Sequence, residues 1–370
     1  VDLHLSTNGG TLWKQVTRWD AARGDSNYAH ADHHALLMPI AAPGRVYDPN
    51  DGGMDVSEDG GLTWVNRSNG LAVTMFYDAD VAPSDGRVFG GGAQDNGTLI
   101  TTTGRPDDHF EILGGDGGWI VFNPADASHL FASYYNLHIF RFRSGMTREV
   151  SPPATRDERE AVWMAFIKLD PKTPTTVFTG SSRVWRSKND GTRWTAVSPS
   201  LDGSQISAIE VALADPRRVY VGTENGAIFR SVDGGNAWTA NLASATLPGH
   251  TITRLATSPT NAGIVYATVA NFGHGHVYRS DDGAISWQDI DKGQLPDVPH
   301  HSIAIPSEAP NTIYVCGDAG VFVSTDAGRT WMNLTRNLPS VMVVDLFYHP
   351  RDGSLSAATY GRSMWRLEVK

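Results

Sequence analysis

The chain has a single cysteine, Cys316, in 370 residues. That excludes a disulfide scaffold and any zinc or iron–sulfur site built from several cysteines. Charged side chains make up only 19% of the residues, and 40 acidic against 30 basic residues give a net charge of -10 without a long run of one sign. A nucleic-acid or anionic-membrane surface needs a basic face, so we expect no nucleic-acid partner. No apolar run approaches the roughly 20 residues of a spanning helix, so we expect no membrane span.

The sequence also lacks a signal-peptide pattern and begins with Val1, from which we expect the C-terminal part of a longer protein. It is rich instead in Gly (38), Pro (20) and Trp (11), and 40% of its residues are hydrophobic. That hydrophobic content is enough for a core and excludes a disordered chain. The composition is typical of tight turns and sheets.

One eight-residue pattern recurs six times: Ser, any residue, Asp or Asn, any residue, Gly, two more residues and Trp. The copies are STNGGTLW (6–13), SEDGGLTW (57–64), SKNDGTRW (187–194), SVDGGNAW (231–238), SDDGAISW (280–287), in which Ala284 replaces the Gly, and STDAGRTW (324–331). The last four tryptophans are 44, 49 and 44 residues apart. An Asx side chain can fold back onto backbone N–H groups while Gly supplies a left-handed dihedral. We therefore predict a turn from which the Trp starts the next strand and packs between layers.

Apolar stretches about 40–50 residues apart form a second periodic signal. They read HHALLMPI, FYDADVAP, GWIVFNPAD, VWMAFIKLDP, AIEVALADP, ITRLATSP, HSIAIPS and VDLFYHP. Their spacing predicts an all-β fold, a single β-propeller of four-stranded antiparallel blades over residues 1–370, with eight blades and seven as the alternative. Each stretch is the expected inner strand of a blade.

The two ends of the chain predict how the ring closes. The last unit supplies three strands and ends in SMWRLEVK, while the first residues supply an octet followed by LWKQV. We predict that N-terminal and C-terminal strands pair to close the ring. The segment VDLHLS duplicates a third strand and is not explained by this closure.

The octet resembles the Asp-box, or BNR, motif. The segments HADHHAL, NDGGMDVSEDGG, QDNGT and GGDGGW further resemble exported bacterial proteins described as sortilin-like or glycosyl-hydrolase BNR-repeat proteins, and are similar to the xyloglucanases. The resemblance implies a propeller, a secreted or periplasmic bacterial location, and ligand binding around the central channel at the face where inner strands begin. The xyloglucanases use two Asp residues between two rings; this chain has material for one, so no catalytic residue is transferred by position.

Polar residues at the starts of the inner strands and in the hairpin turns are the candidate site residues. Alternation along a strand would point His30, Asp32 and His34 the same way. Asp32 and Asp116 are candidate catalytic carboxyls, and His30 and His34 are candidate proton-transfer groups. The remaining candidates, for substrate binding, are Asp51, Asp95, Trp119, Glu160, His250 and His300. For each of them the alternative is a structural role, in which a turn or channel residue only satisfies the hydrogen-bonding groups of its neighbours.

Three functions are compatible with these residues. The first is a glycoside-hydrolase-like propeller that acts on or recognises a polysaccharide or oligosaccharide, with Trp19, Tyr28, Phe76, Tyr77, Trp119, Tyr134 and Tyr135 as stacking candidates. Sialidase activity is not expected, because the arginine triad of that family has no counterpart. The second function is a non-catalytic propeller that binds a protein or peptide, and the sequence leaves open whether the chain is an enzyme. The third is a lyase or hydrolase with a divalent metal on His30, Asp32 and His34, although no cofactor is otherwise predicted.

Overall fold

The computed structural model describes residues 2–243, 246–273 and 275–369. Nine antiparallel sheets make up almost all of its regular structure, beside one short helix, α1 (Arg156–Glu160), so the all-β prediction is confirmed. The chain divides into two compact units, 1–74 and 75–370, which are described separately. Within the described ranges, none of the helical structure is long and apolar enough to cross a membrane.

Seven sheets belong to the second unit. The first three are β6–β9 (Phe76–Val81, Phe89–Ala93, Gly97–Thr101, Phe110–Leu113), β10–β13 (Gly117–Asn123, Asp126–Tyr134, His138–Arg143, Met146–Glu149) and β14–β17 (Ile167–Leu169, Val177–Gly180, Val184–Ser187, Thr195–Ala196). The next two are β18–β20 (Ile206–Val211, Val219–Thr223, Ile228–Ser231) and β21–β24 (Ile252–Ser258, Asn261–Val269, Val277–Ser280, Gln288–Asp289). The last two are β25–β28 (His300–Ala304, Ile313–Gly317, Gly320–Ser324, Met332–Asn333) and β29–β31 (Val343–His349, Ser354–Thr359, Met364–Glu368).

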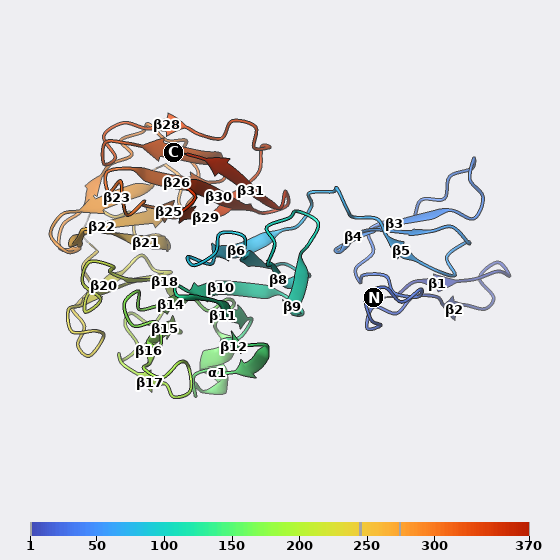
Figure 1. Cartoon of the computed structure of the whole chain (residues 1–370), viewed down its shortest axis with the longest axis horizontal. Coiled ribbons are helices and arrows are strands. Elements are labelled where there is room, and N and C mark those ends of the chain that lie inside the picture. The colour runs from blue at the N-terminus through green and yellow to red at the C-terminus, as the bar shows by residue number, and fades with distance from the viewer. Residues whose placement is uncertain (1, 244–245, 274, 370) are drawn as a thin grey trace. The chain divides into compact units, whose positions relative to one another are not determined.

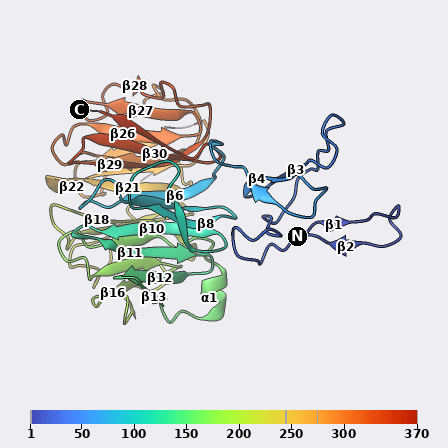
Figure 2. The same cartoon turned by 45° about the vertical axis from the view of Figure 1, so that its right-hand side comes forward.

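The first strands of these sheets form the inner wall of a ring. In chain order β6, β10, β14, β18, β21, β25 and β29 each contact the next, and β29 contacts β6, as Figures 1 and 2 show for the second unit. Buried side chains of neighbouring sheets form the core between them, for example Phe178 with Ile209 and Tyr266 with Ile303. The arrangement is that of a β-propeller, as the sequence predicted. Within the second unit, the closing contact lies between its own strands β29 and β6. A single ring over 1–370 that is closed by N-terminal strands stays a prediction.

Six of the seven inner strands carry one extra residue relative to their partner strand. In β6 the register shifts between Phe76 and Asp78, and in β29 it shifts between Val343 and Asp345. A bulge of this kind turns the following side chains away from the regular alternation of the strand. Four of the residues that follow a bulge are polar: Asp78, Arg254, Ser302 and Asp345.

The octets form closed turns, and three of them lead into the fourth strands β17, β24 and β28. In the octet 280–287, Ser280 Oγ donates to Asp282 Oδ1 (2.8 Å) and accepts from the Ala284 N–H (2.8 Å). Asp282 Oδ1 also accepts from the backbone N–H of Ser286 at 2.9 Å. The Ser286 hydroxyl and backbone N–H, together with the Ser280 hydroxyl and the Ile285 N–H, lower the pKa of Asp282 to about 2. The folded-back Asx geometry predicted from the sequence is present.

The N-terminal unit contains two small sheets. They are β1–β2 (His4–Leu5, Lys14–Gln15) and β3–β5 (Val46–Asn50, Gly53–Ser57, Val65–Asn66). The segment HHALLMPI, predicted as an inner strand, pairs with β3 only at two isolated bridges, His33 with Asn50 and Leu37 with Tyr47. Pro39 has no N–H to donate to a ladder, which limits how far this pairing extends.

Candidate functional site

The predicted site residues of the N-terminal unit lie around the turn between β3 and β4. His34 Nε2 is 2.6 Å from Asp51 Oδ1, and the His34 side chain is 65% exposed. Asp32 is exposed and has a φ of 59°. This left-handed residue interrupts the strand, so the alternation predicted for His30, Asp32 and His34 is wrong.

The same interruption separates the three candidate metal ligands. His30 Nδ1 lies 3.1 Å from the Ala31 carbonyl oxygen, and the His30 backbone N–H donates to Asp55 Oδ2 at 3.1 Å. Throughout the described part of the chain, no group of three or more His, Cys, Asp or Glu side chains is placed to hold a metal ion. The arrangement therefore does not favour the metal-assisted variant built on His30, Asp32 and His34.

Three predicted residues of the second unit are not brought together. Glu160 lies at the exposed end of α1, where its Oε1 pairs with Arg156 Nε at 2.6 Å, and His250 is exposed before β21. His300 is fully buried, and burial lowers its pKa to about 4, so its ring is neutral where it lies 5.1 Å from the His276 ring. A neutral imidazole in the core has the surroundings of a packing residue. Asp32 and Asp116 belong to different units, and their pairing stays a prediction.

Asp95 and Asp116, by contrast, are joined by a hydrogen bond. Asp95 lies at the tip of the β7–β8 hairpin with a φ of 57°, and its N–H donates to Asp116 Oδ1 at 2.9 Å. Glycines allow the two sheets to approach this closely, because a Cβ on Gly92 would overlap the backbone of Gly117 and Gly118. The segments QDNGT and GGDGGW therefore meet where β10 begins.

Tyr77 lies beside both of these carboxylates. Burial raises the pKa of its phenol far above the ordinary value, and the charges of Asp116 and Asp95 raise it further. The Tyr77 ring is 6.0 Å from the ring of Tyr360, whose hydroxyl hydrogen-bonds to Gln94 Oε1. Because Tyr360 follows β30 and Tyr77 lies on β6, this group of side chains crosses the join between the last and first sheets.

Three further aromatic rings, those of Tyr134, Tyr135 and Trp163, form a second group that begins near Asp116. Burial raises the pKa of Tyr134 to about 12, and Tyr135 and the charge of Asp116 add to that effect. The rings of Tyr134 and Tyr135 are 3.9 Å apart, and Tyr135 stacks on Trp163 at 6.2 Å with an interplanar angle of 10°. Trp163 is 57% exposed. We name the whole set the aromatic–acidic face: Tyr360, Tyr77, Asp95, Asp116, Tyr134, Tyr135 and Trp163.

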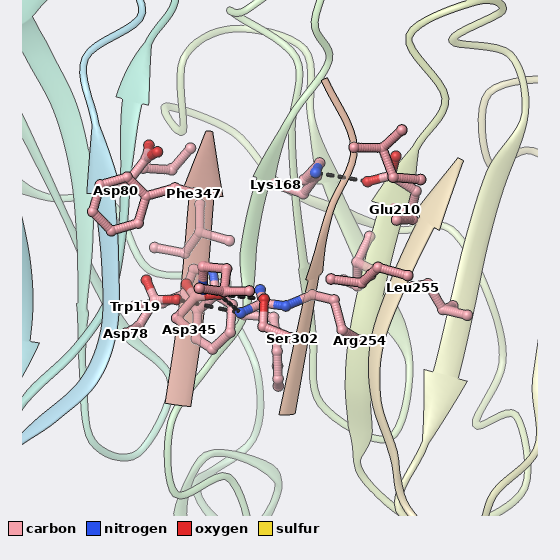
Figure 3. A pocket seen from close by; sticks show the side chains of 18 of the residues that line it. Asp78, Asp80, Trp119, Lys168, Glu210, Arg254, Leu255, Ser302, Asp345 and Phe347 are labelled. Carbon is pink, nitrogen blue, oxygen red and sulfur yellow. Dashed lines mark hydrogen bonds and ion pairs between the residues drawn. The ribbon is translucent and has the colours of Figure 1, made fainter. Parts of the chain in front are cut away.

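A second candidate site lies inside the ring, where a pocket of about 330 Å³ is lined by all seven inner strands. Asp78 and Asp345 come from the neighbouring strands β6 and β29, and Arg254 reaches them from β21, as Figure 3 shows. Arg254 Nη2 is 2.5 Å from Asp345 Oδ1 and 3.8 Å from Asp78 Oδ1. The Ser302 hydroxyl donates to Asp345 Oδ1 at 2.6 Å. These four residues form a buried polar network.

Asp78 has a raised pKa within this network. Its pKa is raised well above the ordinary value because it is fully buried and because Asp345 is charged and hydrogen-bonded to it. The other Asp78 oxygen, Oδ2, accepts the backbone N–H of Ile120 at 2.9 Å. Inner strands are sheet edges with unpaired N–H groups, and Asp78 satisfies one of these on the next sheet. Asp345 is the carboxyl group nearest to Arg254.

Asp80, Lys168 and Glu210 form a second layer of the pocket (Figure 3). Lys168 Nζ is 2.6 Å from Glu210 Oε2, and the Lys168 side chain is 40% exposed. Asp80 Oδ2 accepts the Phe122 N–H at 2.9 Å. Burial nevertheless raises the pKa of Asp80 to about 7, since those backbone bonds only partly offset the loss of water.

Trp119 belongs to this pocket. It was predicted as a substrate-binding residue. The Arg254 guanidinium lies 4.5 Å from the centroid of the Trp119 ring, and the ring of Phe166, the residue before β14, lies 4.1 Å from it. Asp78, Arg254 and Asp345 were not selected from the sequence. The signal was present, because each is a charged residue at the third position of its inner strand. These charged residues were overlooked because the strands were interpreted only as parts of the core.

Comparison with known proteins agrees with the fold. Residues 182–292 match the family model Sortilin-Vps10, described as sortilin, neurotensin receptor 3, and no curated protein matches the chain. The β-propeller domain of Cps50 (Swd1) from Myceliophteria thermophila is similar with a TM-score of 0.58 and 11% identity, over 80% of this chain and 97% of that one. The GH74 xyloglucanase from Xanthomonas campestris has a TM-score of 0.46 and 15% identity, and 90% of this chain covers 65% of it. These similarities agree with the predicted β-propeller fold, and residues 182–292 resemble the sortilin family; the chain spans just under two thirds of the xyloglucanase.

Proposed function

We propose that this propeller recognises a polysaccharide on its aromatic–acidic face. The observation that carries the proposal is the arrangement of Asp116 between two groups of tyrosines, with Trp163 exposed at one end. Sugar rings bind to proteins through apolar faces that cover aromatic rings and through hydroxyls that donate to carboxylates, and the face offers both. The chain of rings from Trp163 to Tyr134 suits several sugar units in a row.

Hydrolysis of the bound glycan is the finer form of this proposal. It requires two carboxyl groups on opposite sides of the scissile bond. Asp95 and Asp116 are the pair that the face supplies, and the Asp95 N–H already orients Asp116. An exported location fits a polysaccharide ligand and is part of the proposal, on the strength of the resemblance to exported bacterial proteins.

A panel of oligosaccharides, with xyloglucan and β-glucan fragments as probes, tests both forms. We expect Trp163→Ala to weaken binding about tenfold, the equivalent of about 1.4 kcal/mol of lost stacking. Trp365→Ala is the matched control, because Trp365 is a 37% exposed Trp on β31 that lies outside the face. Asp116→Asn should abolish any release of reducing ends while it retains the fold. If wild type binds no glycan, or if Trp163→Ala binds as wild type does, the proposal is wrong.

A peptide-binding role of the central pocket is the second candidate. It is favoured by the Sortilin-Vps10 match and by Lys168, which presents a partly exposed ammonium group inside the ring. A carboxylate of a peptide could compete with Glu210 for that ammonium group. Lys168→Met should then abolish binding of a peptide library and leave glycan binding unchanged, which separates the two functions.

A further inference from the structure

Positive charge is concentrated in one part of the second unit. Residues 138–198, which run from β12 to just after β17, contain 11 Lys and Arg against six Asp and Glu, whereas the whole chain has a net charge of -10. Helix α1 and strand β12 lie next to each other in this part, as Figures 1 and 2 show. A local excess of cations on an otherwise acidic protein attracts an anionic ligand to that place.

A pocket of about 280 Å³ lies within this part of the chain. It is lined by the end of β13, by α1 and by the octet 187–194, and its polar side chains include Arg148, Ser151, Arg159 and Thr192. Within the described ranges, the guanidinium groups of Arg148 and Arg159 form no hydrogen bond or ion pair with another residue. The pocket therefore holds two guanidinium groups whose donors are open to a ligand.

Glu149 is the one carboxylate among the described residues that line the pocket, and neighbouring side chains hold it in place. Its Oε1 accepts from the Ser151 hydroxyl at 2.7 Å and lies 2.7 Å from His138 Nδ1. Burial opposes the ionisation of Glu149, but these two groups and the charge of Arg159 together lower its pKa. Glu149 thus balances one of the two guanidinium charges, and one positive charge is left in the lining.

The β11–β12 hairpin joins this pocket to the aromatic–acidic face. Tyr134 pairs across the hairpin with His138, whose ring lies 2.7 Å from the carboxylate of the pocket. At the other end of the ring series, Trp163 comes four residues after Arg159, and the Val162 N–H closes the turn between them by donating to the Arg159 carbonyl at 3.0 Å. The rings from Tyr134 to Trp163 are therefore connected at both ends, by short paths, to the lining of the pocket.

We propose that the glycan recognised by the aromatic–acidic face is anionic, and that Arg148 and Arg159 bind one of its carboxylate or sulfate groups. This inference rests on the proposed function and names the class of its ligand. A guanidinium binds either group through two parallel N–H donors. The acidic group of a sugar unit stacked on Trp163 enters the pocket, while units farther along the face turn neutral hydroxyls toward Asp116.

Three probes with one β-1,4-glucan backbone test the inference: the neutral oligosaccharide, the same oligosaccharide oxidised to a carboxylate at C6, and the same oligosaccharide sulfated at C6. In calorimetric titrations at low salt, we expect the better anionic probe to bind about tenfold more tightly than the neutral one. This difference should shrink as salt is added, since exposed charges are screened. The ranking of the two anionic probes identifies the acidic group that the pocket takes.

Substitution of the two arginines separates the pocket from the rest of the face. Arg148→Gln and Arg159→Gln should each lower the affinity for the anionic probe about fivefold and leave the affinity for the neutral probe unchanged. Arg329→Gln is the matched control, because Arg329 is an exposed arginine of the octet 324–331 and its loss changes the net charge by the same amount. Unchanged binding of the neutral probe also shows that the variants retain the fold.

The outcomes distinguish a failure of this inference from a failure of the proposed function. Equal affinities for the three probes, or equal losses in Arg329→Gln and the pocket variants, would overturn the anionic site while neutral glycan recognition stands. No binding of any probe would overturn both. If Trp163→Ala did not weaken binding of the anionic probe, the pocket would be separate from the face, which also contradicts the inference.

Discussion

Asp78 and Asp345 lie on strands that meet where the ring closes, and burial together with the neighbouring Asp345 carboxyl raises the pKa of Asp78. Both causes favour the protonated form of Asp78 over the charged form. Arg254 balances the charge on Asp345 from across the pocket. The last and first sheets are therefore joined by a buried network of two carboxyl groups and one guanidinium.

Removal of Asp345 should destabilise the second unit strongly. Asp345→Ala leaves the Arg254 guanidinium buried without its nearest partner, which costs about 3–5 kcal/mol in comparable buried pairs. Asp345→Asn keeps a side-chain acceptor for Ser302 and should cost less. Urea denaturation near pH 6 measures both. Asp85→Ala is the control, since it breaks an exposed pair with Arg87 worth about 0–1 kcal/mol; a similar cost for both alanine variants would contradict the role of the network.

Asp80 should make the free energy of unfolding fall as pH rises. Its pKa is about 7 in the folded state against 3.8 ordinarily, so the unfolded chain loses this proton near pH 4 and the folded chain retains it to near neutrality. Between those values the unfolded state binds fewer protons, and stability falls by at most about 1.4 kcal/mol per pH unit. Asp80→Asn should remove this part of the slope. Chemical denaturation of both proteins from pH 4.5 to 8 measures it, and parallel curves would count against the assignment.

A methyl group at Gly92 should displace the aromatic–acidic face. The added Cβ would overlap the backbone at Gly117 and Gly118, which cannot move as a flexible side chain can. Overpacking typically costs about 1–3 kcal/mol, and the shift should also weaken the Asp95–Asp116 bond and glycan binding. Gly263→Ala is the matched control, because its Cβ would lie 3.3 Å from the Asn261 side chain. Thermal unfolding and glycan titration of both variants give the comparison.

The indole hydrogen bonds between sheets should be measurable one at a time. Trp331→Phe retains an aromatic ring but loses the donor to the Ile290 carbonyl, which should cost about 1–3 kcal/mol for the unsatisfied group and the smaller ring. Trp365→Phe loses an exposed Nε1 bond to the nearby Arg362 carbonyl (2.8 Å) rather than a bond between sheets, and should cost less than about 0.5 kcal/mol. Equal losses in urea denaturation would mean that the Nε1 bond does not stabilise the contact between sheets.

Periodicity in the sequence was sufficient to predict the repeating sheets and the octet turns, because both depend on local spacing and on Asx and Gly chemistry. It also selected Asp95 and Asp116, whose hairpin and glycine-rich neighbours are visible as motifs. The Asp78–Arg254–Asp345 network was not predicted, because it depends on tertiary contacts. Arg254 lies 91 residues from Asp345 in the sequence and farther from Asp78, and the strands of Asp78 and Asp345 meet only where the ring closes. The alternation proposed for His30–His34 failed at a single positive φ on Asp32, which no periodicity reveals.

The extra residue in the inner strands has a consequence for how such rings tolerate insertions and deletions. Side chains alternate along a strand, so loss of Tyr77 or Val344 would turn Asp78 or Asp345 to the opposite face and leave the pocket with apolar groups in their place. Single-residue deletions at these points should therefore be far more damaging than substitutions there. The positions of the charged side chains in the pocket therefore depend on the length of the inner strands as well as on their composition.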